Sequence, residues 1–175
     1  MSASAGTRLW VLRVAAATLL LLVVARAALF TTYRVAGASM REALEDGDRI
    51  VVASHPWLVR PVLAGDTVIL SVEDEVLVKR VMACPGDRIA MDHGHVVRNG
   101  RPVVERIPAS FEAGDSFPEY RLSGDEYFVL GDNRRVSIDS RDFGPVSSSQ
   151  LLGKVFLRLH GGAVSAVAAL ERGPD

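Results

Sequence analysis

Short apolar runs separated by turn residues are the feature that most constrains the fold of this 175-residue chain. The runs are rich in valine, isoleucine and leucine, and glycine or proline recurs between them, a pattern typical of β-strands joined by tight turns. Asn99-Gly100, between two valine pairs, is a strong signal for a two-residue hairpin. The expected strands are residues 48–52, 67–70, 75–82, 126–130 and 151–159. We therefore predict a mainly β domain, built as a folded-over antiparallel sheet or barrel.

The N-terminal region has a different composition, with an uninterrupted apolar run at residues 14–25 between Arg13 and Arg26. This run is shorter than the about 20 residues of a full membrane span, but both arginines can extend towards lipid headgroups. We predict that residues 1–32 are a membrane anchor that contains one transmembrane helix. A cleaved secretory signal, with Ala25-Arg26-Ala27 as its cleavage site, and a buried helix of the globular domain are the alternatives.

The composition narrows the classes of function. The chain has 20 basic and 21 acidic residues, so it lacks the basic excess of a nucleic-acid-binding protein. Its single cysteine, Cys84, allows no internal disulfide, and we expect a buried thiol there rather than a nucleophile. Asp92-His93-Gly94-His95 is expected to be a turn rather than a metal site, because further ligands would have to come from elsewhere. Residues 111–121 are polar and contain Pro118, which predicts a surface loop.

Ser39 and Lys79 are candidates for a serine nucleophile activated by a neutral lysine. Side chains alternate along a strand, so Lys79 shares one face with Leu77 and Val81. If this face points to the core, the ammonium loses hydration and its pKa falls. The alternative is that Lys79 points to solvent.

Residues 131–144 are dense in short polar side chains and follow a predicted strand. Asp139 and Arg141 are spaced for an ion pair, and Ser137 offers a hydroxyl to a neighbouring amine. Such a segment is either a structural turn with solvated charges or the scaffold of a functional site.

Three blocks together resemble the bacterial type I signal peptidases, which are membrane-bound Ser-Lys proteases. The blocks are residues 37–40 with Leu44 downstream, residues 78–87, and residues 131–144. The resemblance covers residues 10–160 and agrees in order and spacing. The chain departs from the common family pattern at Gly37, where many members have serine, and at Glu42-Ala43, where Pro-Thr is usual. The absent serine hydroxyl would be a second oxyanion donor, and removing one such donor costs about 3 kcal/mol.

The resemblance implies a role for each matching residue. Ser39 would be the nucleophile, with its backbone N–H as oxyanion donor, and Lys79 would be the general base. Ser137 would orient Lys79. Asp132, Asn133, Asp139 and Arg141 would hold the surrounding loop. The substrate would be added as a strand, and its small side chains would enter pockets lined by Tyr33, Val35, Leu44, Ile50, Leu77 and Val78.

The function implied is removal of signal peptides from exported preproteins with small residues before the cleavage site, without metal or cofactor. Residues 33–175 would be an extracytoplasmic peptidase domain, held at the plasma membrane by a single-pass anchor and contacting the lipid bilayer but no nucleic acid. Two alternatives belong to other classes of protein. One is a catalytically silent, membrane-anchored β-domain that binds extended segments, and the other is a peptidase like the self-cleaving repressors. A narrower option is a peptidase dedicated to one substrate.

Overall fold

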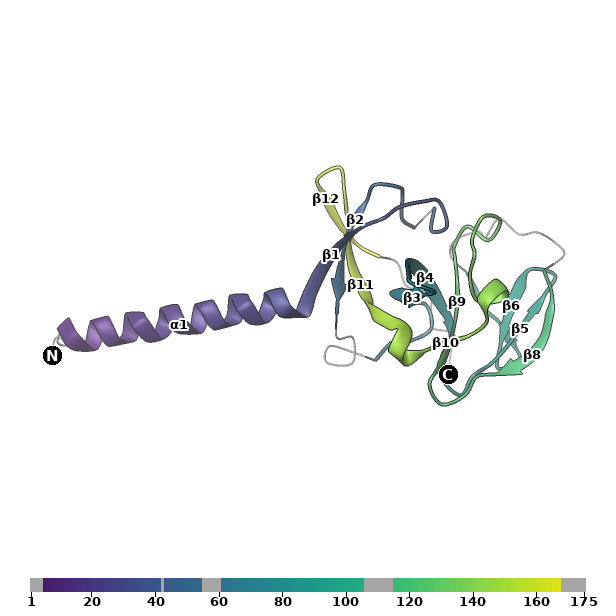
Figure 1. Cartoon of the computed structure of the whole chain (residues 1–175), viewed down its shortest axis with the longest axis horizontal. Helices are drawn as coiled ribbons and strands as arrows, with labels where there is room; N and C mark the ends of the chain where they lie inside the picture. Colours follow the sequence, from purple (N-terminus) through teal and green to yellow (C-terminus); the bar gives the residue numbers. More distant parts are fainter. Residues whose placement is uncertain (1–4, 42, 55–60, 106–114, 168–175) are drawn as a thin grey trace.

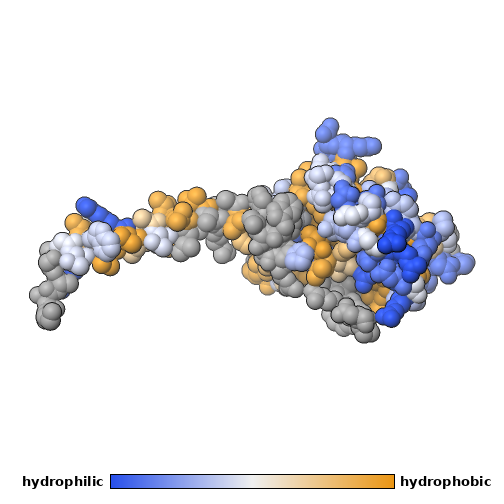
Figure 2. Space-filling view, turned by 90° about the horizontal axis from the view of Figure 1, so that it is seen from below, coloured by the Kyte–Doolittle hydropathy of each residue, from blue (hydrophilic) through white to orange (hydrophobic). Residues whose placement is uncertain are grey.

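The structure is a computed structural model that describes residues 5–41, 43–54, 61–105 and 115–167. A long helix, α1 (Ala5–Leu29), projects from a β-domain that contains the rest of the described chain, as Figure 1 shows. The first strand, β1 (Phe30–Arg34), begins directly after the helix. The apolar side chains along α1 are exposed, with Leu12 at 65% and Leu21 at 68% (Figure 2).

These exposures contradict the alternative of a helix buried in the globular domain. Among the described residues, no helix combines the length and the apolarity that crossing a membrane requires. The predicted transmembrane helix is therefore not shown.

The larger of two antiparallel sheets carries the predicted strands. Its order is β1, β2 (Arg49–Ala53), β11 (Leu151–His160), β3 (Thr67–Val72), β4 (Glu75–Ala83), β9 (Glu126–Leu130) and β10 (Val146–Ser147), with β12 (Ala163–Ala166) paired to β11. This order runs from β1 to β10 without returning, so the described strands form an open sheet and the predicted barrel is wrong. The mainly β, antiparallel prediction is confirmed.

The smaller sheet lies at the end of the domain farthest from α1 (Figure 1). Its order is β7 (Arg101–Pro102), β6 (His95–Arg98), β5 (Arg88–Asp92) and β8 (Phe117–Arg121). The hairpin at Asn99-Gly100 is confirmed, and both residues have positive φ, as a type I′ turn requires. The loop predicted over residues 111–121 is wrong over Phe117–Arg121, which form β8, and residues 111–114 of that prediction lie outside the described residues. Pro118 is tolerated there because β8 is an edge strand of this sheet.

Among the described residues, three apolar clusters bury side chains of the larger sheet, and two of them involve residues predicted to bind substrate. The Met40 cluster consists of Val35, Met40, Leu44, Ile50, Val52, Ile69 and Val155, with Tyr33, Ala43, Val78 and Val167 packed against it. The Leu70 cluster consists of Val62, Val68, Leu70, Val81, Val129, Val146 and Leu151, with Leu77 and Cys84 among the side chains packed against it. Strand β4 contributes side chains to both of these clusters.

Candidate active site

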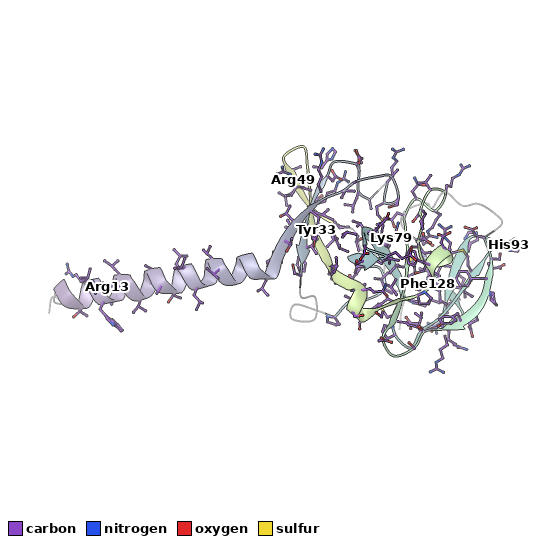
Figure 3. All side chains as sticks on the ribbon, in the orientation of Figure 1. Arg13, Tyr33, Arg49, Lys79, His93 and Phe128 are labelled. Carbon is purple, nitrogen blue, oxygen red and sulfur yellow. The ribbon has the colours of Figure 1, made fainter. Side chains whose placement is uncertain are left out.

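Lys79 is buried in the middle of β4, with 2% of its surface exposed. Its Nζ donates a hydrogen bond of 3.0 Å to Ser137 Oγ. Burial lowers the pKa of the Lys79 ammonium, while the negative charge of Asp139 opposes this shift and the positive charge of Arg141 adds to it. Figure 3 shows Lys79 within the β-domain and away from the tip of the small sheet, where His93 lies. The solvent-facing alternative is therefore wrong.

The segment that carries Ser137 is held by Asp139 and Arg141. The Asp139 carboxylate has no exposed surface, accepts from the Gly131 N–H at 2.9 Å and caps a short helix, α3 (Ser140–Phe143). Arg141 donates from Nε to Asp139 Oδ1 at 2.9 Å and from Nη2 to the Arg134 carbonyl at 2.7 Å. The predicted ion pair is present, and it connects both ends of the loop that positions Ser137.

Ser39 lies on the connection between β1 and β2, and Asn133 joins this connection to the same loop. The Asn133 N–H donates to the Ser39 carbonyl at 2.9 Å, and Asn133 Nδ2 donates to the Ala38 carbonyl at 3.1 Å. A Cβ at Gly131 would lie 2.1 Å from Ser137 Oγ and 2.7 Å from the Ser39 carbonyl oxygen. The absent side chain of Gly131 is therefore what lets Ser39 and Ser137 approach each other.

Ser39 and Lys79 thus come from separate elements and reach the same small region. Within the described residues, Lys79 Nζ is hydrogen bonded to Ser137 Oγ, and no hydrogen bond joins it to Ser39 Oγ. Catalytic hydrogen bonds in substrate-free enzymes are often long and shorten when substrate binds. Direct proton transfer from Ser39 would require its hydroxyl to move towards the amine.

A second contact, a buried ion pair next to Lys79, connects β4 to the start of the loop that carries Ser137. Arg80 donates from Nε and Nη2 to the two Asp132 oxygens, each at 2.7 Å, and from Nη1 to the Gly65 carbonyl at 2.9 Å. The two side chains are 2% and 4% exposed. Sequence reasoning missed this pair, although a charged residue within an apolar strand signals a buried partner.

Five of the six residues predicted to bind substrate lie together in or against the Met40 cluster, namely Tyr33, Val35, Leu44, Ile50 and Val78. The sixth, Leu77, packs against the Leu70 cluster instead. Sequence reasoning did not include Met40, Ala43 and Ile69, which join the five. Met40 could have been found from its position directly after Ser39. Contact of these side chains with substrate stays a prediction.

Gly37 adopts a backbone conformation that explains why serine is absent there. Its φ is 94°, a region that side chains other than hydrogen rarely allow, and its N–H donates to Asp46 Oδ1 at 2.9 Å. The chain therefore has a glycine-specific turn at this position. The Ser39 backbone N–H stays the predicted oxyanion donor.

The remaining candidates do not form a second reactive centre. Burial raises the pKa of the Cys84 thiol to about 11, which is the opposite of what a nucleophile needs. His93 and Gly94 have positive φ and form the predicted turn between β5 and β6. In the part of the chain that the structure describes, no three histidine, cysteine, aspartate or glutamate side chains are grouped to hold a metal ion.

Comparisons with known proteins identify the family that this chain resembles. A family model described as signal peptidase, peptidase S26, matches residues 7–160. Signal peptidase I of Bacillus amyloliquefaciens is 35% identical over 143 residues, which cover 76% of this chain and 77% of that protein. Signal peptidase IB of Staphylococcus aureus strain N315 is 30% identical over 167 residues, which cover 85% of this chain and 87% of that protein. A crystal structure of a signal peptidase I from Enterococcus faecalis V583 matches with a TM-score of 0.47 and 22% identity, covering 54% of this chain and 97% of that chain.

Proposed function

Because this chain belongs to the signal peptidase family, peptidase S26, whose members are serine peptidases, we propose that it removes signal peptides from exported preproteins with Ser39 and Lys79 as a catalytic dyad. The family excludes the self-cleaving-repressor alternative. One observation carries the assignment of the dyad. The buried Lys79 amine bonds to Ser137 Oγ, and Gly131 brings Ser137 against the Ser39 backbone.

The proposed reaction needs no group from outside the chain except water. Neutral Lys79 takes the Ser39 hydroxyl proton as the serine oxygen attacks the scissile carbonyl, and the Ser39 N–H donates to the oxyanion that forms. Lys79 then gives the proton to the leaving amine, which departs and leaves an acyl-enzyme. A water deprotonated by Lys79 hydrolyses this ester and restores the Ser39 hydroxyl. Ser137 holds the amine in position, and Asp139 and Arg141 hold Ser137.

The substrate would bind as an additional strand along β4. Strand β3 pairs with residues 75–80 of β4 on one side, whereas β9 pairs with β4 on the other side only from Arg80 onward. No described strand therefore pairs with residues 75–79 of β4 on the side that β9 occupies from Arg80 onward. An extended peptide at this edge would face Val78 and the Met40 cluster, whose bulky buried side chains leave room only for small residues.

Membrane attachment through α1 is part of the proposal. The helix exposes large apolar side chains around its whole circumference, which is typical of a helix surrounded by lipid. A single crossing would place residues 14–25 in the hydrocarbon core, with Arg13 extended towards one headgroup layer. Alkaline carbonate extraction of membranes that contain the full-length protein tests this. The protein should stay in the pellet, and its release into the supernatant would reject an integral anchor.

The decisive experiment on the dyad is Ser39→Ala, assayed by processing of a preprotein in detergent or liposomes. Processing should cease because the proposed acyl-enzyme is an ester of the Ser39 hydroxyl, which alanine lacks. Ser148→Ala, which changes an exposed serine of the same domain, is the matched control and should process normally. Retained cleavage by Ser39→Ala would remove Ser39 from the mechanism. Wild-type protein that binds preprotein but never cleaves it would instead support the silent binding domain.

A further inference from the structure

Glu105 is a largely buried carboxylate that contacts the loop carrying Ser137. Its side chain is 12% exposed and forms an ion pair with Arg134, whose side chain is 3% exposed. Arg134 Nη2 donates the hydrogen bond to Glu105 Oε2. Glu105 lies outside the three sequence blocks that resemble the signal peptidases. The proposed reaction gives this residue no role, although it is bound to the loop on which the reaction depends.

The residues just before Glu105 are held by the smaller sheet. The Val103 N–H donates to the Val96 carbonyl of β6 at 2.8 Å. Val103 also packs against the third apolar cluster, to which both sheets contribute side chains, namely Met82, Ala83, Ile89, Met91, Val96, Leu122, Phe128 and Leu130. Glu105 follows Val103 by two positions, so its carboxylate reaches the loop from a fixed point on the smaller sheet.

Arg134 connects Glu105 to both ends of the loop and to the connection that carries Ser39. Arg134 Nε donates to the Gly131 carbonyl at 3.0 Å, and the Arg134 carbonyl accepts from Arg141 Nη2 at 2.7 Å. The preceding residue, Asn133, donates its N–H to the Ser39 carbonyl at 2.9 Å. A shift of Arg134 would therefore move the contacts that hold Ser39 as well as those that hold Ser137.

The charges around Arg134 show why it needs this carboxylate. Within the described residues, Arg134 Nη1 is buried and makes no hydrogen bond, and the partner of Nε is an uncharged carbonyl. A buried charge that loses its ionic partner is strongly unfavourable, so the guanidinium would move to find another. Burial raises the pKa of the Glu105 carboxyl, the charges of Arg134 and Arg80 oppose this shift, and the charge of Asp132 adds to it. The Arg80–Asp132 pair is therefore within electrostatic range, and Asp132 is the carboxylate for which Arg134 would compete.

From these contacts we propose that Glu105 is a positioning residue through which the smaller sheet fixes the loop that holds Ser39 and Ser137. The proposal depends on the proposed function for the identity of the reacting groups. Glu105 acts through Arg134 and does not belong to the Met40 cluster, where substrate side chains are proposed to bind. Its loss should therefore slow the chemical step and leave substrate binding as it is.

Steady-state kinetics of full-length Glu105→Gln test this role. The substitution keeps the shape of the side chain and removes the charge. We expect kcat for a preprotein substrate to fall about tenfold while KM stays within about twofold of the wild-type value, because the reacting groups are misplaced but the binding surface is intact. Glu119→Gln is the matched control, since Glu119 is a 47% exposed carboxylate of the same sheet, and both of its constants should equal those of the wild type. An unchanged kcat in Glu105→Gln, or a change confined to KM, overturns the inference.

Amide hydrogen exchange distinguishes positioning from a general loss of stability and does not depend on activity. The Asn133 N–H, which is bonded to the Ser39 carbonyl, should exchange about tenfold faster in Glu105→Gln than in the wild type. The Val81 N–H of β4, which is bonded to the Asp66 carbonyl at 2.8 Å, should exchange at the wild-type rate. Equal acceleration of both amides, or none at Asn133, rejects the inference. Failure of the wild-type protein to cleave preproteins rejects the proposed function instead.

Discussion

Lys79 and Ser39 are positioned by different kinds of structure. Lys79 lies in a nine-residue strand that pairs with β3 and β9, and its neighbour Arg80 is fixed by a buried ion pair. Ser39 lies on a connection that Asn133 joins to the opposite loop through two hydrogen bonds. Folding of the sheet therefore sets the position of the proposed base, whereas contacts between two loops set that of the proposed nucleophile. This difference explains why Lys79 is already bonded to Ser137 while Ser39 Oγ is not bonded to Lys79.

The largest expected effect is on the base itself. Lys79→Arg keeps a positively charged side chain of similar length, but a guanidinium cannot be deprotonated in a protein. Activity should fall by a factor on the order of 10⁴ or more, as when a catalytic base is removed from other serine peptidases. Preprotein cleavage is measured beside thermal unfolding, so that loss of fold is distinguished from loss of chemistry. A folded Arg variant with substantial activity would show that Lys79 is not the base.

The second prediction concerns the ion pair that supports the lysine strand. Asp132→Ala leaves Arg80 buried without its carboxylate partner, and breaking such a pair costs about 3–5 kcal/mol of unfolding free energy. Glu119→Ala removes the partner of Arg88 in an ion pair whose side chains are 52% and 47% exposed, and it should cost less than about 1 kcal/mol. Urea denaturation of both variants gives the comparison. Equal losses would mean that the buried pair does not hold β4.

Much of the fold could be predicted because it depends on local signals. Apolar runs and turn residues located β2, β3, β4, β9 and β11 to within about two residues, and Asn99-Gly100 located a hairpin. Strand β8 was missed because Pro118 and polar neighbours resemble a loop, and only its edge position in the small sheet makes it a strand. The anchor was expected from apolar composition, and the structure shows the helix without showing a span.

Sequence motifs pointed to the candidate site residues, but the contacts of these residues could not be predicted from the motifs. Nothing local to Asp132 indicates that it pairs with Arg80, because the two are 52 positions apart and meet only when β4 and β9 are neighbours. Gly131 likewise reads as a turn glycine, and its close approach to Ser39 and Ser137 appears only in three dimensions. Sequence therefore supplied the candidate side chains, and tertiary structure determines how they are held.

The third prediction targets Gly131, where the connection that carries Ser39 meets the loop that carries Ser137. Gly131→Ala would put a methyl group 2.1 Å from Ser137 Oγ and 2.7 Å from the Ser39 carbonyl, so one of them must move. Displacing a reacting group by about 1 Å costs about 10²-fold in rate, and we expect kcat to fall by that amount. Gly124→Ala is the matched control, because a Cβ there meets no atom within 4 Å and its rate should be unchanged. A Gly131→Ala enzyme with normal kcat would show that the approach of the loops is not needed.

The fourth prediction uses pH to report on Lys79 alone. Its folded pKa lies below 10.5 because of burial, and only the neutral amine can act as base. The rate should therefore fall about tenfold per pH unit below that pKa. The same shift makes stability depend on pH. Between the folded pKa of Lys79 and 10.5, the unfolded chain binds more protons than the folded chain does. The unfolding free energy of the wild type relative to Lys79→Met should rise with pH across this window. A pH-independent difference would show that the Lys79 pKa is not lowered by folding.

The smallest expected effect is that of Asn133→Ala, which distinguishes the position of Ser39 from the environment of Lys79. Asn133→Ala removes the hydrogen bond to the Ala38 carbonyl but leaves the backbone bond to Ser39, a loss of about 1 kcal/mol, or about five-fold in kcat. Because Asn133 acts on the nucleophile loop, the pKa that governs the acid limb of the rate profile should stay where it is in the wild type.

Asp139→Asn provides the contrast, because the Asp139 charge raises the pKa of Lys79 and its removal should move the acid limb to lower pH. If Asn133→Ala also moved the acid limb, the position of the nucleophile loop would be coupled to the environment of the lysine. This result would reject the view that the sheet positions the proposed base independently of the loops that position the proposed nucleophile.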